Sequence, residues 1–196
     1  MEGPKTCLDM AELGTHGMRL GGLETPAADE AELTRAVAAL YRVHFQFVWR
    51  SLRRLGVRPS SLEDAVQDVF LVAHRKLHAF DGRSSHRAWL FAIAVRAAAE
   101  HRRRDARLHL DPDAQVVTAH LEKTLELRQQ IDLLDRVLDM LPDDQRVVFV
   151  MAEIEQFSVP EIATALGVKL NTVYSRLRLG RAHFERTLAR QRKGRA

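Results

Sequence analysis

The stretch from Phe157 to Phe184, FSVPEIATALGVKLNTVYSRLRLGRAHF, decides the fold because it has the pattern of two helices joined by a tight turn. Ser158 and Glu161 form an S-x-x-E capping box, which predicts the start of the first helix. Gly167 ends that helix, because glycine readily takes the left-handed conformation that a tight turn needs. The second helix has apolar residues at helical spacing: Val173, Leu177 and Phe184. The stretch therefore predicts a helix-turn-helix, a fold that can place its second helix in a DNA major groove.

Charge is distributed unevenly along the chain. Ser158 to Ala196 contains nine Lys and Arg against two acids, and Arg83 to Arg107 contains seven Arg against two acids. Between them, Leu108 to Phe157 contains eleven Asp and Glu against four Lys and Arg. Two basic stretches that flank an acidic centre suit a protein that binds nucleic acid at two separate places. The alternative for the C-terminal stretch is an ordinary helical hairpin with a solvated basic face.

The composition indicates a soluble globular protein of two small domains. The chain has 196 residues, of which 46% are hydrophobic and 29% charged, with a formal net charge of +4. No apolar run is long enough to span a bilayer and no signal peptide is recognisable, so we expect a cytoplasmic protein that does not insert into a membrane. Cys7 is the single cysteine, and the nine histidines lack zinc-binding spacing. We therefore expect no metal and no cofactor.

Hydrophobic periodicity predicts an all-α fold with two small helical domains joined by a flexible linker. Residues 1–31 lack periodicity and are predicted to be a disordered extension. Residues 32–107 form the first domain, residues 108–130 the linker, and residues 131–196 the second domain with the helix-turn-helix and a basic tail.

Three amphipathic helices are predicted in the first domain. The first runs from about Glu32 to Leu55, the second is capped by Ser61, and the third runs from about Ala88 to His101 and ends in three arginines. A polar loop, Phe80 to Arg87, precedes the third helix.

Four motifs occur in a fixed order. They are DAVQDVF from Asp64, FDGRSSHRAWL from Phe80, LPDDQR from Leu141, and the SVPEIATALGVKLNTVYSRL stretch from Ser158. In this order and separation they resemble the extracytoplasmic-function (ECF) sigma factors of bacterial RNA polymerase, over roughly residues 33 to 190. The resemblance implies a region 2-like domain at 32–107 and a region 4-like domain at 131–196. It also implies a transcription initiation factor that is not an enzyme, with core RNA polymerase, promoter DNA and an anti-sigma factor as partners.

The resemblance also implies three sets of site residues. The polymerase-binding residues are Asp64, Gln67, Asp68 and Phe70. The residues for the minus-ten element are Asp81, Gly82, Ser84, Ser85, His86, Arg87, Arg96, Arg103 and Arg104. The residues for the minus-thirty-five element are Lys169, Asn171, Thr172, Tyr174, Ser175, Arg176, Arg178 and Arg181.

Physical chemistry supports parts of this assignment. Asp64 and Asp68 lie four residues apart and off the apolar face of their helix, so they form an outward acidic pair. Phe80 and Trp89 are predicted to anchor the loop in the core; the alternative is that they are stacking platforms for a base. Arg102 either binds a DNA phosphate or complements the dipole at a helix end.

Two features depart from the family pattern. Tyr174 stands where many relatives have a basic residue, and Leu179-Gly180 replaces a common Arg-Ala. Glycine at this position costs about 1 kcal/mol of helix propensity relative to alanine. The departures bear on base preference and promoter affinity.

Two other functions fit the sequence less well. A free-standing helix-turn-helix regulator would use only the C-terminal domain, and it leaves the Asp64 and Asp68 surface and the Phe80 to Arg87 loop without a function. An enzyme acting on nucleic acid would need paired carboxylates, a glycine-rich phosphate site or a nucleophile with its base, and the sequence has no such pattern.

Overall fold

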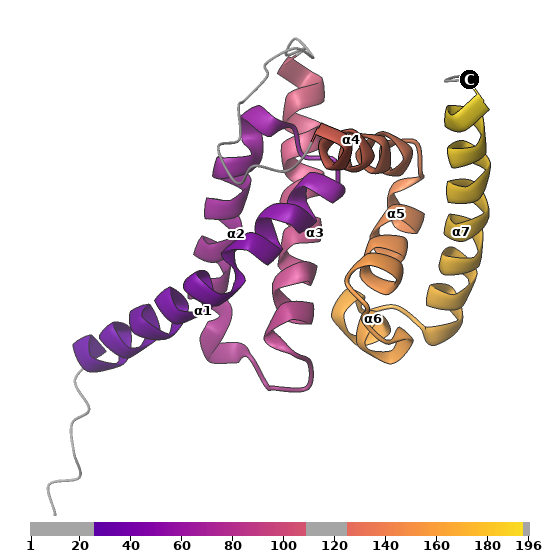
Figure 1. Cartoon of the computed structure of the whole chain (residues 1–196). Helices are drawn as coiled ribbons and strands as arrows, with labels where there is room; N and C mark the ends of the chain where they lie inside the picture. The colour runs from indigo at the N-terminus through magenta and orange to yellow at the C-terminus, as the bar shows by residue number, and fades with distance from the viewer. Residues whose placement is uncertain (1–25, 109–124, 194–196) are drawn as a thin grey trace, which may run out of the picture.

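The structure, a computed structural model, describes residues 26–108 and 125–193 and is all-α over these residues, as predicted (Figure 1). Helices α1 to α3 form an N-terminal bundle, and α4 to α7 form a C-terminal bundle. The remaining parts of the predicted extension and linker, residues 1–25 and 109–124, lie outside the described residues.

Helix α1 (Pro26–Arg54) begins six residues before its predicted start. Residues 26–31 are therefore helical, and their assignment to a disordered extension was wrong. Proline is tolerated in the first helical turn because its missing N–H needs no partner there. Gly56, with a φ of +84°, lies just beyond the C-terminal end of the helix.

Ser61 precedes helix α2 (Leu62–Lys76), but its side chain does not cap that helix. A short 3₁₀ turn, η1 (Pro59–Ser61), leads into the helix, and the Ser61 hydroxyl donates to the buried carboxylate of Asp105 at 3.0 Å. The prediction that Ser61 caps α2 was therefore wrong, because its hydroxyl bonds instead to Asp105, 44 residues away. A second 3₁₀ turn, η2 (Leu77–Ala79), follows the helix.

Helix α3 (His86–Leu108) is longer than predicted at both ends. The Ser85 hydroxyl accepts a hydrogen bond from the Ala88 backbone N–H at 3.2 Å, so this serine caps the helix. Because the helix continues to Leu108, the predicted arginine-rich end at Arg102 lies inside it.

The C-terminal bundle contains the predicted helices. Its members are α4 (Leu125–Asp139), α5 (Asp143–Phe149) with the π-helical turn η3 (Val150–Ile154), α6 (Val159–Leu166) and α7 (Leu170–Lys193). Helix α4 begins inside the stretch predicted as linker. Phe149 of α5 stacks on Phe184 of α7 with ring centroids 4.7 Å apart.

The predicted helix-turn-helix is confirmed in α6 and α7. The Glu161 carboxylate accepts from the Ser158 backbone N–H at 2.9 Å, and the Ser158 hydroxyl accepts from the Glu161 N–H at 3.4 Å. Gly167 ends α6 in the left-handed conformation, with φ +66° and ψ +36°. Both predicted signals therefore act as expected.

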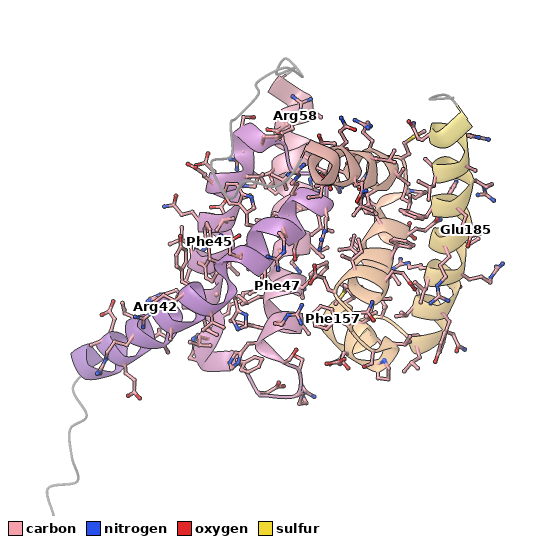
Figure 2. The ribbon with its side chains drawn as sticks, in the orientation of Figure 1. Arg42, Phe45, Phe47, Arg58, Phe157 and Glu185 are labelled. Atoms are coloured by element: carbon pink, nitrogen blue, oxygen red, sulfur yellow. The ribbon has the colours of Figure 1, made fainter. Side chains whose placement is uncertain are left out.

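The two bundles pack against each other. Helix α3 contacts α6, and α1 contacts α4. Phe157, from the loop before α6, packs against Phe47 of α1 and Phe91 of α3, with ring centroids 6.4 and 6.2 Å away. Figure 2 shows Phe47 and Phe157 facing each other across the two bundles. Buried apolar residues of both bundles consequently form one continuous core.

Candidate protein and nucleic-acid interfaces

The outward face of α2 carries the acidic pair predicted from the sequence. Asp64 and Gln67 are exposed, and the Asp68 carboxylate is half exposed. His101 of α3 is buried, and its Nε2 lies 2.8 Å from Asp68 Oδ2. This contact holds the Asp68 side chain in place while leaving it accessible to a partner.

Phe70, which the resemblance grouped with these residues, is instead buried, with 6% of its surface exposed. It follows Val66 by four residues, so both side chains lie on the core face of α2. Its ring packs against Tyr41 of α1 at 4.7 Å. Phe70 therefore packs in the core and holds α2 in place, whereas Tyr41 is half exposed at the surface.

The loop before α3 borders an open hollow of about 260 Å³, smaller than most drug-sized ligand sites. Its walls include an aromatic pair, an ion pair and a hydroxyl: Phe80, Trp89, Asp81, Arg83 and Ser84. Thr164 and Ala165 of α6 complete the wall from the C-terminal bundle. A hollow with aromatic and polar walls can receive an unstacked base.

Asp81 organises this loop by binding Arg83. Its Oδ1 accepts from the Arg83 backbone N–H at 3.1 Å, and its Oδ2 accepts from the guanidinium at 2.5 Å. The backbone hydrogen bond and then the guanidinium hold the pKa of the Asp81 carboxyl below its usual range. Gly82, between the two, has a φ of +70° and open space where a side chain would project.

Phe80 and Trp89 were expected to be core anchors, but both are only partly buried and line the hollow. Phe80 stacks on His86 with centroids 4.6 Å apart and contacts Trp89 at 5.2 Å. Sequence reasoning also left Arg83 out of the site, although its place in the polar loop was a usable signal.

Arg87 leaves the loop in the other direction, towards the C-terminal bundle. Its guanidinium donates to Glu155 at 2.8 Å. His44 of α1 was also missed by sequence reasoning. Burial, followed by the nearby charges of His86 and Arg87, lowers the pKa of His44.

The arginines along α3 divide into two groups. Arg96, Arg103 and Arg104 are exposed, as phosphate contacts must be. Arg102 instead donates to the Leu55 carbonyl at 2.8 Å and to Asp143 of α5 at 2.6 Å. Its predicted phosphate role is not compatible with these contacts, and Arg102 is a structural residue in this conformation.

Most of the predicted minus-thirty-five residues are exposed at the start of α7. These are Lys169, Asn171, Tyr174, Ser175, Arg178 and Arg181, whereas Thr172 and Arg176 are partly buried. The Ser175 hydroxyl donates back to the Thr172 carbonyl at 3.0 Å. Arg176 pairs with Asp144 at 3.1 Å and Arg181 with Glu153 at 2.6 Å. Acids of the same bundle thus hold two of the predicted DNA-binding cations.

The packing of α7 on α5 explains why position 180 is a glycine. It is buried where α7 crosses α5, and a Cβ there would lie 3.3 Å from the Gln145 carbonyl oxygen. The glycine therefore allows the two helices to approach closely.

Comparison with known proteins identifies the two bundles. The sigma-70 region 2 family matches residues 40–108, and the sigma-70 region 4 family matches residues 131–184. Over 165 residues the chain is 31% identical to the ECF RNA polymerase sigma factor SigM of Mycobacterium tuberculosis, covering 84% of this chain and 83% of SigM. The chain belongs to the ECF sigma factors.

Two solved structures have a similar fold. CnrH, in complex with the cytosolic domain of CnrY, is 25% identical with a TM-score of 0.62, covering 82% of this sigma factor and 94% of CnrH. RpoE of Bartonella quintana, in complex with the anti-sigma factor NepR, is 24% identical with a TM-score of 0.56, covering 76% of this chain and 96% of RpoE.

This sigma factor directs promoter-specific transcription initiation with RNA polymerase, and the alternative of a free-standing regulator is not favoured. Its N-terminal bundle is region 2, and its C-terminal bundle is region 4. Within the described ranges, no helix combines the length and apolar character needed to cross a bilayer.

Proposed function

We propose that this sigma factor uses three separate surfaces. The outward face of α2, with Asp64, Gln67 and Asp68, binds core RNA polymerase. The hollow of the Phe80 to Arg87 loop receives a base of the minus-ten element. The first turns of α7 bind the minus-thirty-five element. We infer that the chain acts in the cytoplasm and has no catalytic activity of its own.

The minus-ten assignment rests on one observation, the hollow between Phe80, Arg83 and Trp89. Its aromatic rings offer a stacking surface, and the Arg83 guanidinium lies beside it, fixed by Asp81. A base that leaves the duplex needs both kinds of contact, because it loses its stacking neighbours and carries a phosphate with it. Exposed Arg96, Arg103 and Arg104 can neutralise further phosphates along α3.

The minus-thirty-five assignment rests on the helix-turn-helix geometry. Asn171, Tyr174 and Arg178 project from the start of α7, where a recognition helix presents its side chains to base edges. Arginine can bind guanine through two hydrogen bonds, and an apolar or aromatic side chain can contact the methyl group of thymine. Tyr174 therefore gives this sigma factor a contact that a basic residue would not supply.

An anti-sigma factor is the further partner that we infer. RpoE was solved with the anti-sigma factor NepR, and CnrH with the cytosolic domain of CnrY. An inhibitor that contacts regions 2 and 4 together would bind the intact chain much more tightly than either region alone, because the second contact becomes intramolecular.

Single substitutions in the reconstituted holoenzyme test the two DNA assignments. Phe80→Ala and Arg83→Ala should reduce strand opening, measured by permanganate reactivity of unpaired thymines. Because stacking on an aromatic ring is worth about 1–3 kcal/mol per base, we expect a loss of about fivefold or more for Phe80→Ala. Arg178→Ala should instead weaken binding to duplex promoter DNA before it opens.

Arg136→Ala is the matched control, since Arg136 is an exposed arginine of α4 outside the three surfaces. It should leave both measurements unchanged. Wild-type strand opening by Phe80→Ala and Arg83→Ala would contradict the assignment of the loop.

A further inference from the structure

Regions 2 and 4 meet through oppositely charged surfaces. Arg53 of α1 pairs with Asp132 at 3.0 Å and with Asp135 at 2.6 Å, both in α4. Arg54 and Arg87 of region 2 both pair with Glu155, and Arg102 pairs with Asp143. The acidic stretch of the sequence thus supplies carboxylates to a row of region 2 arginines.

Glu155 is the most buried acid in these contacts, with 5% of its side chain exposed. One carboxylate oxygen accepts from the Arg54 guanidinium, and the other accepts from Arg87 at 2.8 Å. Burial of an ionised carboxylate costs desolvation free energy, which charged partners must offset. Both charged partners of Glu155 belong to region 2, so Glu155 depends on region 2 for its position. We call these two contacts the Glu155 bridge.

Two aromatic rings contact Arg87 beside the Glu155 bridge. The Arg87 guanidinium carbon lies 4.6 Å from the centre of the Phe47 ring and 5.3 Å from that of Phe157. Each ring attracts the cation, while 45% of the Arg87 side chain stays exposed. Arg87 is consequently held by one residue of its own region and two of region 4.

The local backbone explains how Glu155 and Phe157 reach the same arginine. The π-helical turn η3 ends at Ile154, and Gln156 then adopts a φ of +60°, which is uncommon for a residue other than glycine. This turn directs the side chains on either side of Gln156 to region 2. Such costly backbone conformations persist where surrounding contacts maintain them.

The same arrangement places region 4 beside the base-binding hollow. Thr164 and Ala165 of α6 form part of its wall, opposite Phe80 and Arg83. A DNA strand that entered the hollow and reached Arg87 would therefore meet α6 and the loop before it.

We propose that the chain occludes part of its own minus-ten surface: the Glu155 bridge and Phe157 hold region 4 against Arg87 and against one side of the loop hollow until polymerase or DNA separates the regions. The carboxylate of Glu155 occupies the position that a DNA phosphate would take at Arg54 and Arg87. The occlusion rests on the proposed minus-ten role of the loop, but the closed contact itself does not.

The distance between the regions tests the closed contact directly. Spin labels at Arg75→Cys in α2 and Glu185→Cys in α7, both exposed positions, are placed in the full chain with Cys7→Ser. Pulsed electron resonance should give one narrow distance distribution for the otherwise unchanged chain. Glu155→Gln removes the bridging charge, and we expect a broader distribution shifted to longer distances.

Glu153→Gln is the matched control, since it removes the same charge two residues away from an acid that pairs with Arg181 inside region 4. It should keep the narrow distribution. Arg54→Gln breaks the bridge from the region 2 side and serves if Glu155→Gln does not fold, as judged by circular dichroism. A narrow, unshifted distribution in every folded bridge variant would overturn the Glu155 bridge as the closing contact, and it would leave the proposed function untouched.

Binding of single-stranded DNA tests the occlusion. The probe is a fluorescent twelve-nucleotide strand of mixed sequence, added to the full chain without polymerase. If the closed form holds nine-tenths or more of the population, opening should raise the apparent affinity about tenfold, because only the open fraction binds. Glu155→Gln should show this gain and Glu153→Gln should not. An opened Glu155→Gln chain that binds the strand no better than the starting chain would overturn the occlusion.

Discussion

Ser158 and Glu161 together determine where the helix-turn-helix begins. Glu161 accepts from both the backbone N–H and the hydroxyl of Ser158, and these hydrogen bonds lower the pKa of its carboxyl from the usual 4.5. An acid whose pKa is lower in the folded state stabilises the fold above its unfolded pKa. That contribution is lost as the pH falls through the lowered folded value.

Glu161→Gln should therefore destabilise the protein at pH 7 and have a smaller effect in acid. We expect the difference in unfolding free energy between the two proteins to be constant above about pH 5.5 and to shrink below 4.5. Denaturant unfolding followed by circular dichroism over this pH range measures it. Glu185→Gln, an exposed acid of α7, is the control, and an identical pH dependence for both variants would contradict the interpretation.

Single residues also show which contacts the sequence could predict and which it could not. Ser158 and Gly167 were predicted correctly because their partners lie within five residues. Ser61 was not, because its hydroxyl bonds to Asp105, and no local pattern reveals that partner. Phe70 was assigned to a docking surface by resemblance, although its spacing from Val66 and Ala73 already indicated the core face.

At the scale of the element, α2 carries a core face and a docking face on one helix. Its core face packs on α1 and α3, which fixes the direction of the opposite face with Asp64 and Asp68. His101 of α3 reaches under the helix to Asp68. The periodicity predicted both faces, whereas the supporting histidine depends on the way in which α3 crosses.

Reversal of both charges on α2 tests its docking role. The double variant Asp64→Lys, Asp68→Lys should lose core polymerase by several kcal/mol of binding energy, because attraction to a basic partner becomes repulsion. Affinity capture of core polymerase measures the loss. Glu30→Lys with Glu32→Lys, two exposed acids of α1, is the charge-matched control and should bind normally. Undiminished capture by a folded Asp64→Lys, Asp68→Lys chain would remove α2 as the docking surface.

At the scale of the whole molecule, the sequence predicted two helical domains but not the contact between them. The acidic centre and the two basic stretches were visible as charge blocks. Which arginine each acid meets is determined by the packing of α3 on α6 and of α1 on α4. Phe157 shows the same limit, because no local pattern reveals that it packs on Phe47 and Phe91 of region 2.

The ion pairs between regions 2 and 4 also differ in how well their acids are stabilised. Burial raises the pKa of the Asp135 carboxyl even though Arg53 beside it acts in the opposite direction. Desolvation thus outweighs pairing there, as it often does for partly buried ion pairs. Glu155 pairs with two arginines, one of which also contacts two aromatic rings, which is why separation of the regions is expected to depend on Glu155.

We infer that this sigma factor gives core RNA polymerase a choice of promoter through two DNA-binding regions on one chain. The most direct measurement is transcription of fragmented genomic DNA by purified core polymerase, with and without the chain, followed by mapping of the transcript 5′ ends. We expect new start sites that appear only with the chain and share two sequence elements at a constant separation. Start sites identical to those of core polymerase alone, or new sites sharing only one element, would contradict this inference.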